Sequence, residues 1–500
     1  MQPVSLFHPA KEEIEVLRGL KSGSLTTIPA RPILPPMLLT KRRTPFAYLC
    51  ATNSLHFSVP LILLLTALCL AANAQEAKSS PGATDFVLKE VYDPDGQIPF
   101  RSGQAPLGMV ELQGVSADPF KAEYWEKNKL HWVPETRMPL LAPRLGGVYR
   151  NIYAPSVIED GTGWRLFYAA WDGVDTVNDR VYSASTPDFI DFYDRHTVIE
   201  HGVFMHVSNV NVQRAEEGSL HAIATALVGG QQANKPVYFS SPDGRTWNGS
   251  PEPYTAAMSD IVAVEGYAAY EQGDENGANV LLRDHGKWML YFTNWRDPGK
   301  CYWAQGETPA RFKFGSLALA TSHAVNDVKH FSARGKDYYV MALHKKGDVT
   351  GAADTDKLWY SLSSDGRTFG KEILLPGARE EQDRYIFAVG FVTRKDRILG
   401  VLYGAGASER CERNRIFGYW LQKRILLTAR RDYTRGNGLE LEATGALGPD
   451  RQWFKLPQGQ PFEGTITVFA EDGTTLLGSQ AVTLQPGVVY RLEWTATEKP

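Results

Sequence analysis

Acidic side chains in polar loops are the groups of this chain whose types and positions suit catalysis. A carboxylic acid can protonate a leaving oxygen while a second carboxylate acts as a base or nucleophile, and these two roles together hydrolyse glycosidic bonds. The loops that lead into and out of successive apolar strands are rich in Asp, Glu, Arg and Trp. We expect the catalytic acids among Asp172, Asp297, Asp327, Glu275 and Glu381.

The position of an acid next to a strand suggests its role. Asp172 directly follows Trp171 at the end of a strong apolar strand, and Asp297 ends the segment Trp295-Arg296-Asp297. An opposite charge lowers the pKa of a carboxyl group, so we expect Arg296 to hold Asp297 ionised.

The other candidates would lie over or around a central pocket. Asp327 opens a strand that we expect to be closest to the axis of the fold, and Glu275 and Glu381 are the expected acids of raised pKa. For every acid the alternative is a solvated loop residue without a catalytic role. The expected substrate-binding residues are Trp171, Trp295, Arg296, Trp303, His206 and His344.

Histidines on these loops raise the question of a metal. His206, His323 and His344 would bind substrate or contribute to an ion site, but no tight spacing of ligand-type residues supports such a site. We therefore expect no metal and no cofactor.

The loops connect a hairpin that recurs five times, in which an apolar strand, a polar turn and a second, aromatic-rich strand follow one another. The turns lie 49 to 68 residues apart. A repeat of this length with several strands per unit indicates an all-β protein with a β-propeller, here of five blades over 149–435. The copies are YAPSVIEDGTGWRLFYAAW (153–171), NVNVQRAEEGSLHAIATAL (209–227), NVLLRDHGKWMLYFTNW (279–295), DVKHFSARGKDYYVMALH (327–344) and FAVGFVTRKDRILGVLYGA (387–405).

A second repeated element follows the hairpins. Asp-Gly pairs offer tight turns, the Asp side chain can accept hydrogen bonds from the backbone of the turn, and the next aromatic residue would pack between blades. We expect these turns to be structural and to lie on the far side of the propeller from its pocket. The copies are STPDFIDF (185–192), SSPDGRTW (240–247), ETPARFKF (307–314) and SSDGRTFG (363–370).

The composition is that of an ordinary globular protein. The 500 residues are 43% hydrophobic and 22% charged, with a formal net charge of −3. This leaves ample apolar material for a core, and without a basic surplus we expect no nucleic-acid partner.

The N-terminal region has the pattern of an export signal. Basic residues at 41–43 precede an apolar stretch at 59–74 that ends in Ala-Asn-Ala, and this stretch is short for a membrane span. Residues 1–74 are the expected signal peptide with an extended leader, and Met37 is an alternative start. We expect the mature protein to be secreted or periplasmic and free of the membrane.

Two further regions flank the repeats. Residues 75–148 read as a linker and lead-in with a short helix near 119–132. Residues 436–500 alternate apolar and polar residues around Gly-containing turns, which indicates either a small β-sandwich or a strand that closes the propeller. Cys301 and Cys411 remain after the leader, either as a disulfide or as two free thiols.

The pattern Y-A-P-S-V, D-G, W-x-L-F-Y and the S-x-D-G-x-x-W/F turns resemble the five-bladed glycosidases of glycoside hydrolase families 43 and 32 over roughly 149–430. The resemblance implies a five-bladed propeller, a carbohydrate substrate and carboxylate catalysis, and we expect a monomeric glycosidase. The positions at which those families carry their acids hold Ala154, Asn209, Gly277 and Val325. Their catalytic residues are therefore not carried over.

Other functions fit the same scaffold. A non-catalytic glycan-binding propeller would need no acids at those positions. A sialidase-like enzyme is suggested by the Asp-Gly turns, although sialidases have six blades. A phosphorylase would need clustered cations such as Arg410, Arg413 and Arg415.

Overall fold

A computed structural model describes residues 86–91, 105–143, 150–172, 179–229, 233–267, 276–294, 296–345, 353–409, 413–430 and 438–494. Within these ranges the chain is almost entirely β-structure, and α2 (Ala122–Glu126) is the one α-helix. It lies inside the segment for which a short helix was predicted. The expected signal peptide lies outside the described residues. No helix in the described ranges has the length and apolarity needed to cross a membrane.

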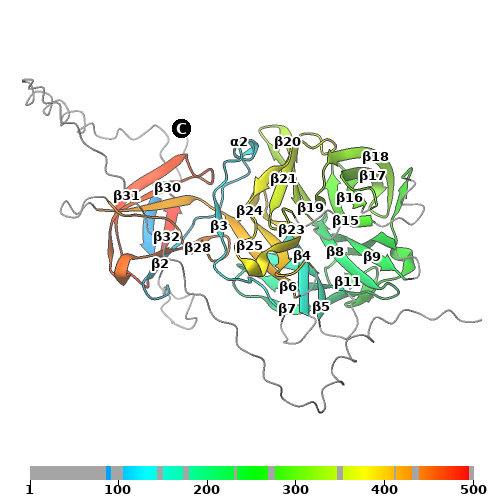
Figure 1. Ribbon diagram of the computed structural model, residues 1–500, viewed down its shortest axis with the longest axis horizontal. Helices are drawn as coiled ribbons and strands as arrows, with labels where there is room; N and C mark the ends of the chain where they lie inside the picture. The colour runs from blue at the N-terminus through cyan, green and yellow to red at the C-terminus, as the bar shows by residue number, and fades with distance from the viewer. Residues whose placement is uncertain are drawn as a thin grey trace, which may run out of the picture. The chain divides into compact units, whose positions relative to one another are not determined.

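Five sheets, here called ring sheets 1 to 5, each begin with one of the predicted hairpins (Figure 1). They are antiparallel apart from one short parallel edge strand in each of two sheets. Ring sheet 1 holds β4 (Arg150–Asp160), β5 (Gly163–Asp172), β6 (Arg180–Thr186), β7 (Tyr193–Glu200) and β13 (Tyr254–Thr255). Ring sheet 2 holds β8 (His206–Arg214), β9 (Leu220–Val228) and β10 (Ala233–Ser241), followed by the short pair β11 (Thr246–Trp247) and β12 (Ser250–Pro251).

Ring sheet 3 holds β15 (Asn276–Asp284), β16 (Lys287–Asn294), β17 (Lys300–Thr308), β18 (Arg311–Ala320) and β14 (Ala263–Glu265). Ring sheet 4 holds β19 (Ala324–Ala333), β20 (Lys336–His344), β21 (Leu358–Ser363) and β22 (Ile373–Leu375). Ring sheet 5 holds β23 (Tyr385–Arg394), β24 (Arg397–Gly406), β25 (Arg415–Leu421) and β3 (Trp132–Pro134).

The first strands of the ring sheets contact one another in a closed circuit, in the order β4, β8, β15, β19, β23 and back to β4. Radial repetition of antiparallel sheets is the β-propeller architecture. Both faces of each sheet are therefore covered, which explains why the second strands read as continuous apolar runs. In β5, Leu166 and Tyr168 enter the core between ring sheets 1 and 5, and Phe167 enters the core between ring sheets 1 and 2.

The second strands of all five ring sheets end on one face of the ring. Neighbouring ring sheets are joined on this face by a hydrogen bond. One partner lies near the start of a first strand, and the other lies in the preceding sheet, either in its second strand or in the loop that follows that strand. We call this the loop face, and the opposite side, which carries the hairpin turns, the hairpin face. The five contacts are Val207 N to Asp179 O (2.9 Å), Thr225 Oγ1 to Gly277 O (2.8 Å), Thr321 N to Gly299 O (2.9 Å), Ile386 N to Thr355 O (2.9 Å) and Ile152 N to Asn414 O (3.0 Å).

Each first strand carries a bulge at the same place along its length. The register slips after Tyr153, Ser208, Asn276, Val325 and Ile386. A bulge bends its strand and re-aims the side chains beside it. The residues at which pairing resumes are Ser156, Asn211, Asn279, Asp327 and Ala388, four of them polar and all buried.

Three of these residues, Ser156, Asn211 and Asp327, belong to an axial network that joins all five ring sheets. Asn211 Nδ2 donates to Asp327 Oδ1 (3.1 Å), and Asn211 Oδ1 accepts from the backbone N–H of Leu281 (3.1 Å). Asp327 Oδ2 accepts from Phe391 N (2.9 Å), and Lys329 Nζ lies 3.1 Å from Asp327 Oδ1. Val212 N donates to Ser156 Oγ (2.9 Å), which adds ring sheet 1.

The Asp-Gly turns lie on the hairpin face, as predicted. Asp243 Oδ1 accepts from the backbone N–H groups of Arg245 (2.8 Å) and Thr246 (2.7 Å), with Gly244 at φ 73°. Asp365 makes the matching contacts with Arg367 and Thr368. The aromatic residues that follow, Trp247 and Phe369, are buried between neighbouring sheets, so the predicted packing role is confirmed.

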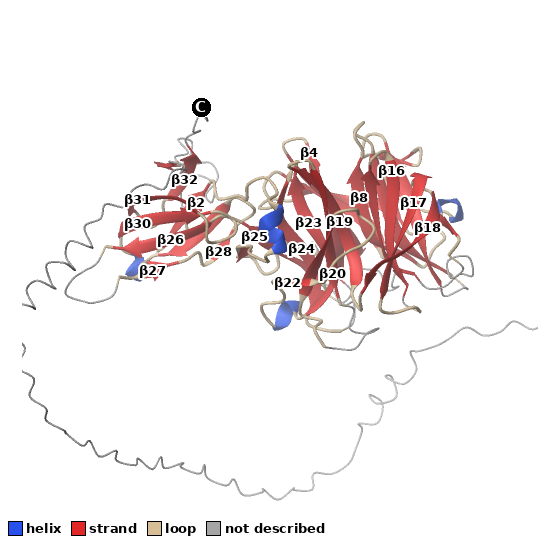
Figure 2. Cartoon of the chain, turned by 90° about the horizontal axis from the view of Figure 1, so that it is seen from above, coloured by secondary structure: helices blue, strands red, loops and turns tan. Residues whose placement is uncertain are grey.

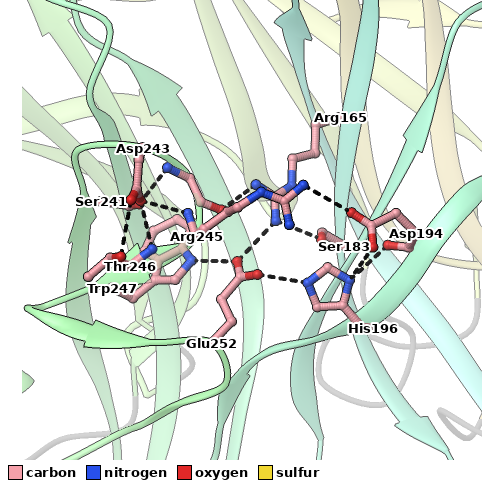
Figure 3. Close-up of polar contacts among 11 residues, drawn as sticks. Arg165, Ser183, Asp194, His196, Ser241, Asp243, Arg245, Thr246, Trp247 and Glu252 are labelled. Atoms are coloured by element: carbon pink, nitrogen blue, oxygen red, sulfur yellow. Dashed lines mark hydrogen bonds and ion pairs between the residues drawn. The ribbon is translucent and has the colours of Figure 1, made fainter.

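A polar network beside the first of these turns links ring sheets 1 and 2 (Figure 3). Glu252 accepts from Arg165 Nη2 (3.0 Å) and from Trp247 Nε1 (3.0 Å), and its other oxygen lies 2.8 Å from His196 Nε2. Arg165 also donates to the carbonyl oxygen of Gly244. The buried charge of Arg165 is thus paired and hydrogen-bonded, as burial of an ion requires.

The remaining strands form two sheets around a separate apolar core. The first runs in the order β1 (Phe86–Glu90), β32 (Val489–Trp494), β2 (Met109–Gln113), β29 (Arg451–Lys455) and β28 (Gly445–Ala446). The second runs in the order β27 (Glu440–Leu441), β26 (Arg424–Ala429), β30 (Phe462–Phe469) and β31 (Leu476–Leu484) (Figure 2).

The N-terminal lead-in thus contributes strands to both parts of the fold. β1 and β2 join the two-sheet module, and β3 pairs with β25 to complete ring sheet 5. Sequence analysis left open a closing strand from the C-terminal region, but the outer strand of ring sheet 5 comes from the N-terminal side. Cys301 is buried as a free cysteine, and Cys411 lies outside the described residues.

Removing the axial carboxylate should destabilise the fold severely. In Asp327→Ala the buried ammonium of Lys329 loses its counter-ion, and Asn211 and the Phe391 N–H lose their acceptor. We expect the free energy of unfolding to fall by about 3–5 kcal/mol, the cost of breaking a buried pair. Urea unfolding measures this loss of unfolding free energy. The control is Asp160→Ala, whose exposed pair with Arg214 should be worth about 1 kcal/mol or less; equal losses in both variants would contradict the axial role.

The turn carboxylate Asp243 should make stability depend on acid pH. Backbone hydrogen bonds from Arg245 and Thr246 lower the pKa of Asp243 to about 2. A lowered folded-state pKa stabilises the fold above the unfolded value of about 4 and loses that effect as the pH falls toward 2. Asp243→Ala should therefore have a lower Tm than wild type at neutral pH, with a difference that narrows below pH 4. A Tm difference that stays constant across this range would refute the assignment.

Candidate active site

Asp179 is a buried carboxylic acid on the loop face. It immediately precedes β6, and its backbone carbonyl accepts from Val207 N at the start of ring sheet 2. Only 8% of Asp179 is exposed. Tyr153 OH donates to Asp179 Oδ2 at 2.7 Å, from the position on β4 where the bulge begins. The side chain is thus fixed at the junction of the first two ring sheets.

Its surroundings favour the protonated form. Burial raises the pKa of Asp179, while the hydrogen bond from Tyr153 and the charges of His206 and Arg180 oppose that rise without cancelling it. Asp179 Oδ1 is buried from solvent and has no hydrogen-bond partner within the described part of the chain. A carboxyl group of raised pKa with one free oxygen is suited to donate a proton to a ligand.

Asp297 provides the opposite type of carboxylate on the same face. It follows β16 in the loop that returns to β17, and it is partly exposed. Hydrogen bonds from Tyr302 and Lys300 lower the pKa of Asp297, so it is ionised under conditions in which Asp179 holds its proton. Sequence analysis assigned this effect to Arg296, whereas the groups that produce it are Tyr302 and Lys300. An ionised carboxylate can act as a base or nucleophile.

Two other predicted acids have different surroundings. Asp327 lies near the axis as expected, but both of its oxygens are engaged in the axial network and its side chain is 2% exposed. Glu381 lies in a 3-10 turn (Glu381–Asp383) with its side chain 73% exposed, paired with Arg384 at 3.5 Å. Neither position supports the predicted catalytic role, which stays a prediction for both residues.

Of the predicted substrate-binding residues, one lies beside Asp179 and two are buried elsewhere in the ring. His206 begins β8, and its charge influences Asp179, so the structure brings these two residues together. Trp171 is buried at 5% exposure and lines a small cavity with Asn151 and Tyr182. His344 is buried at the end of β20, where its Nδ1 lies beside the side-chain oxygen of Asn326.

Trp303 and Arg296 belong to the third strand of ring sheet 3 and to the loop before it. Trp303 is on β17, donates to Ser316 Oγ (3.1 Å) and is covered by the guanidinium of Arg367 at 5.2 Å from the ring centroid. It therefore packs against a neighbouring sheet. Arg296 is exposed in the loop that contains Asp297. Glu275 and Trp295 lie outside the described residues, and Asp172 is the last residue of β5; their predicted roles stay predictions.

Sequence analysis did not single out Asp179, which lies in the loop that follows Trp171 and Asp172. The available signal was its place directly before a third strand, at the mouth of a loop rich in aspartate. Nothing local distinguishes it from Asp172 or Asp175. Its burial depends on Tyr153 and Val207, which belong to other strands, so the raised pKa is a product of the ring closure.

The chain was compared with family models, curated proteins and solved structures. No family model matches the chain, and no curated protein matches it. The structural neighbours include a family 62 α-L-arabinofuranosidase domain from Coprinopsis cinerea, with a TM-score of 0.43 and 14% identity over 59% of this chain and 97% of that one. A glycosyl hydrolase from Bacteroides ovatus has a TM-score of 0.41 and 10% identity, covering 58% and 92%.

An N-acetylgalactosamine deacetylase from F. plautii has a TM-score of 0.40 and 13% identity, covering 62% of this chain and 95% of the enzyme. Neighbours at such low identity act on carbohydrates in different ways. The activity of this chain must therefore be argued from its own residues.

Replacing Asp179 should raise stability at neutral pH. A folded-state pKa above the unfolded value means that stability is full below about pH 4 and is lost as the pH rises through the folded pKa. Each unit of elevation corresponds to about 1.4 kcal/mol. Asp179→Asn removes the buried charge, so its Tm should exceed that of wild type at pH 7, and the advantage should disappear near pH 4. A variant less stable by the same amount at every pH would contradict this account of Asp179.

Proposed function

We propose that the five ring sheets are the blades of a five-bladed β-propeller and that the protein is a glycoside hydrolase acting on oligo- or polysaccharides. The single observation that carries the proposal is Asp179, a buried carboxyl group of raised pKa with an unengaged oxygen on the loop face. The carbohydrate substrate is supported by the resemblance of the repeat pattern to five-bladed glycosidases.

In this mechanism Asp179 acts as the general acid. Its proton passes to the glycosidic oxygen as the bond between that oxygen and the anomeric carbon breaks, and the leaving group departs as an alcohol. An ionised carboxylate either takes a proton from a water molecule that attacks the anomeric carbon, or attacks that carbon itself to form a glycosyl ester. In the second case water, deprotonated by Asp179, then hydrolyses the ester. Asp297 has the lowered pKa that this role requires, and Asp172 is the second candidate for it.

Tyr153 and His206 assist the acid by position. The Tyr153 hydroxyl holds Asp179 Oδ2, so we assign the proton transfer to Oδ1, which is buried and which the substrate oxygen would have to reach on binding. His206 begins the adjacent first strand, and we assign it to binding a sugar hydroxyl beside the scissile bond. We further propose that the protein is exported and monomeric, with the basic and apolar pattern at 41–74 supporting export.

A non-catalytic glycan-binding propeller is the second candidate. It is favoured by Ala154 and Asn209, which occupy bulge positions at φ 50° and 48° where related propeller enzymes would place acids. A hydrolase consumes its glycan substrate, whereas a glycan-binding propeller only binds it. A hydrolysis assay combined with a glycan-binding measurement therefore separates the two functions.

The test is release of reducing sugar from a panel of polysaccharides and aryl glycosides. Asp179→Asn should lower kcat by about 10²–10⁴-fold, the usual contribution of a general acid, and should remove the alkaline limb of the rate profile. Asp160→Asn, on the hairpin face, is the matched control and should keep wild-type rates. Hydrolysis unaffected by Asp179→Asn would overturn the role of Asp179, and glycan binding without any hydrolysis would favour the glycan-binding propeller.

Tyr153, the hydrogen-bond partner of Asp179, offers a second test of the general-acid role. The Tyr153 hydrogen bond lowers the pKa of Asp179, so Tyr153→Phe should raise that pKa further. The alkaline limb of kcat/KM should then move to higher pH, with a moderate change in the maximum rate. A lower rate with an unchanged profile would show that Tyr153 only supports the local structure.

A further inference from the structure

A second polar cluster lies on the hairpin face, between ring sheets 3 and 4. It combines the β15–β16 turn, which carries Asp284 and His285, with the β19–β20 hairpin, which carries His330 and Asp337. The cluster borders a cavity of about 340 Å³ whose wall also includes Lys287 and Arg367. This face is opposite to the loops that hold Asp179, so the cluster is independent of the proposed active site.

Three ligand-type atoms of this cluster face one another. Asp284 Oδ1 lies 3.7 Å from His285 Nε2 and 3.6 Å from His330 Nδ1, and the three atoms all lie within 4.8 Å of each other. In a tetrahedral site with bonds of about 2.0–2.1 Å, adjacent ligand atoms are roughly 3.3–3.5 Å apart. Small side-chain adjustments would therefore bring all three atoms onto one ion.

The groups behind these atoms have the arrangement that supports metal ligands. His330 Nε2 lies 2.8 Å from Asp337 Oδ1, which fixes the tautomer that leaves Nδ1 free to coordinate. Ser332 donates to the same oxygen of Asp337 at 2.8 Å. Tyr339 OH donates to both oxygens of Asp284 at 3.0 Å, and the His330 ring stacks on the Tyr339 ring at 4.6 Å. The carboxylate–histidine pairing is a built feature of this hairpin.

His285 is the movable member. It is 67% exposed at φ 44° in its turn, and its Nε2 also lies 3.4 Å from Asp337 Oδ2. Two imidazoles and one carboxylate favour a transition metal over calcium or magnesium, which prefer oxygen ligands. Asp284 and His285 also line the adjoining cavity.

We propose that Asp284, His285 and His330 bind a divalent transition-metal ion, with zinc as the best fit, and that Asp337 and Tyr339 orient two of the ligands. The ion would connect the hairpins of two neighbouring ring sheets. Sequence analysis found no metal site because His285 and His330 come from different repeats. Only the packing of ring sheet 3 against ring sheet 4 brings them together.

Calorimetric titration of ZnCl₂ into chelator-treated protein, purified without a histidine tag, tests the proposal. We expect one ion per chain and a raised Tm with zinc. His285→Gln and His330→Gln should each weaken binding at least tenfold, and Asp337→Asn should weaken it about 10–100-fold. His285 is exposed, so its variant should fold even if the His330 variant does not.

His196→Gln is the matched control, because His196 is also 2.8 Å from a carboxylate oxygen but belongs to no ligand cluster among the described residues. It should bind zinc as wild type does. Cobalt substitution gives an independent readout, since tetrahedral Co²⁺ absorbs visible light far more strongly than the hydrated ion. Absence of stoichiometric zinc binding, or binding unchanged by both His285→Gln and His330→Gln, would overturn the proposal.

Discussion

The buried pairing of Asp327 with Asn211 and Lys329 is the contact on which the ring depends. Asn211 connects ring sheets 2, 3 and 4, and Asp327 extends the network to ring sheet 5 through the Phe391 N–H. Apolar packing between sheets is tolerant of small sliding movements, because it has no directional requirement. Hydrogen bonds to a buried charge are directional and costly to lose, so this network fixes the register of the first strands relative to one another.

The fixed register determines what the loop face can do. Asp179 is buried only because β8 approaches the end of ring sheet 1 closely enough for Val207 to bond its backbone, and Tyr153 reaches it only from a bulged strand. Asp297, on a more open loop, meets Lys300 and Tyr302 instead. Two carboxylates of the same residue type thus acquire opposite pKa shifts from burial on one side and hydrogen bonding on the other.

On the hairpin face, too, contacts between neighbouring sheets determine the surroundings of the charged side chains. Each Asp-Gly turn satisfies its own backbone and buries the next aromatic side chain against the neighbouring sheet. Between the turns, charged side chains meet across sheet junctions, as Arg165 meets Glu252 and as Asp284 meets His330. At the first junction Arg165 and Glu252 are both buried and paired, whereas the second junction borders a cavity that offers room for a ligand.

The sequence by itself determined the hairpins, the Asp-Gly turns and their structural role, because apolar alternation, turn residues and side-chain caps act within a few residues. It also indicated that Asp327 lies near the axis. It did not identify Asp179, the outer strand supplied by β3, or the histidine pair at 285 and 330. These depend on contacts between segments far apart in the chain, and burial, pKa and ligand geometry arise only when ring closure brings such segments together.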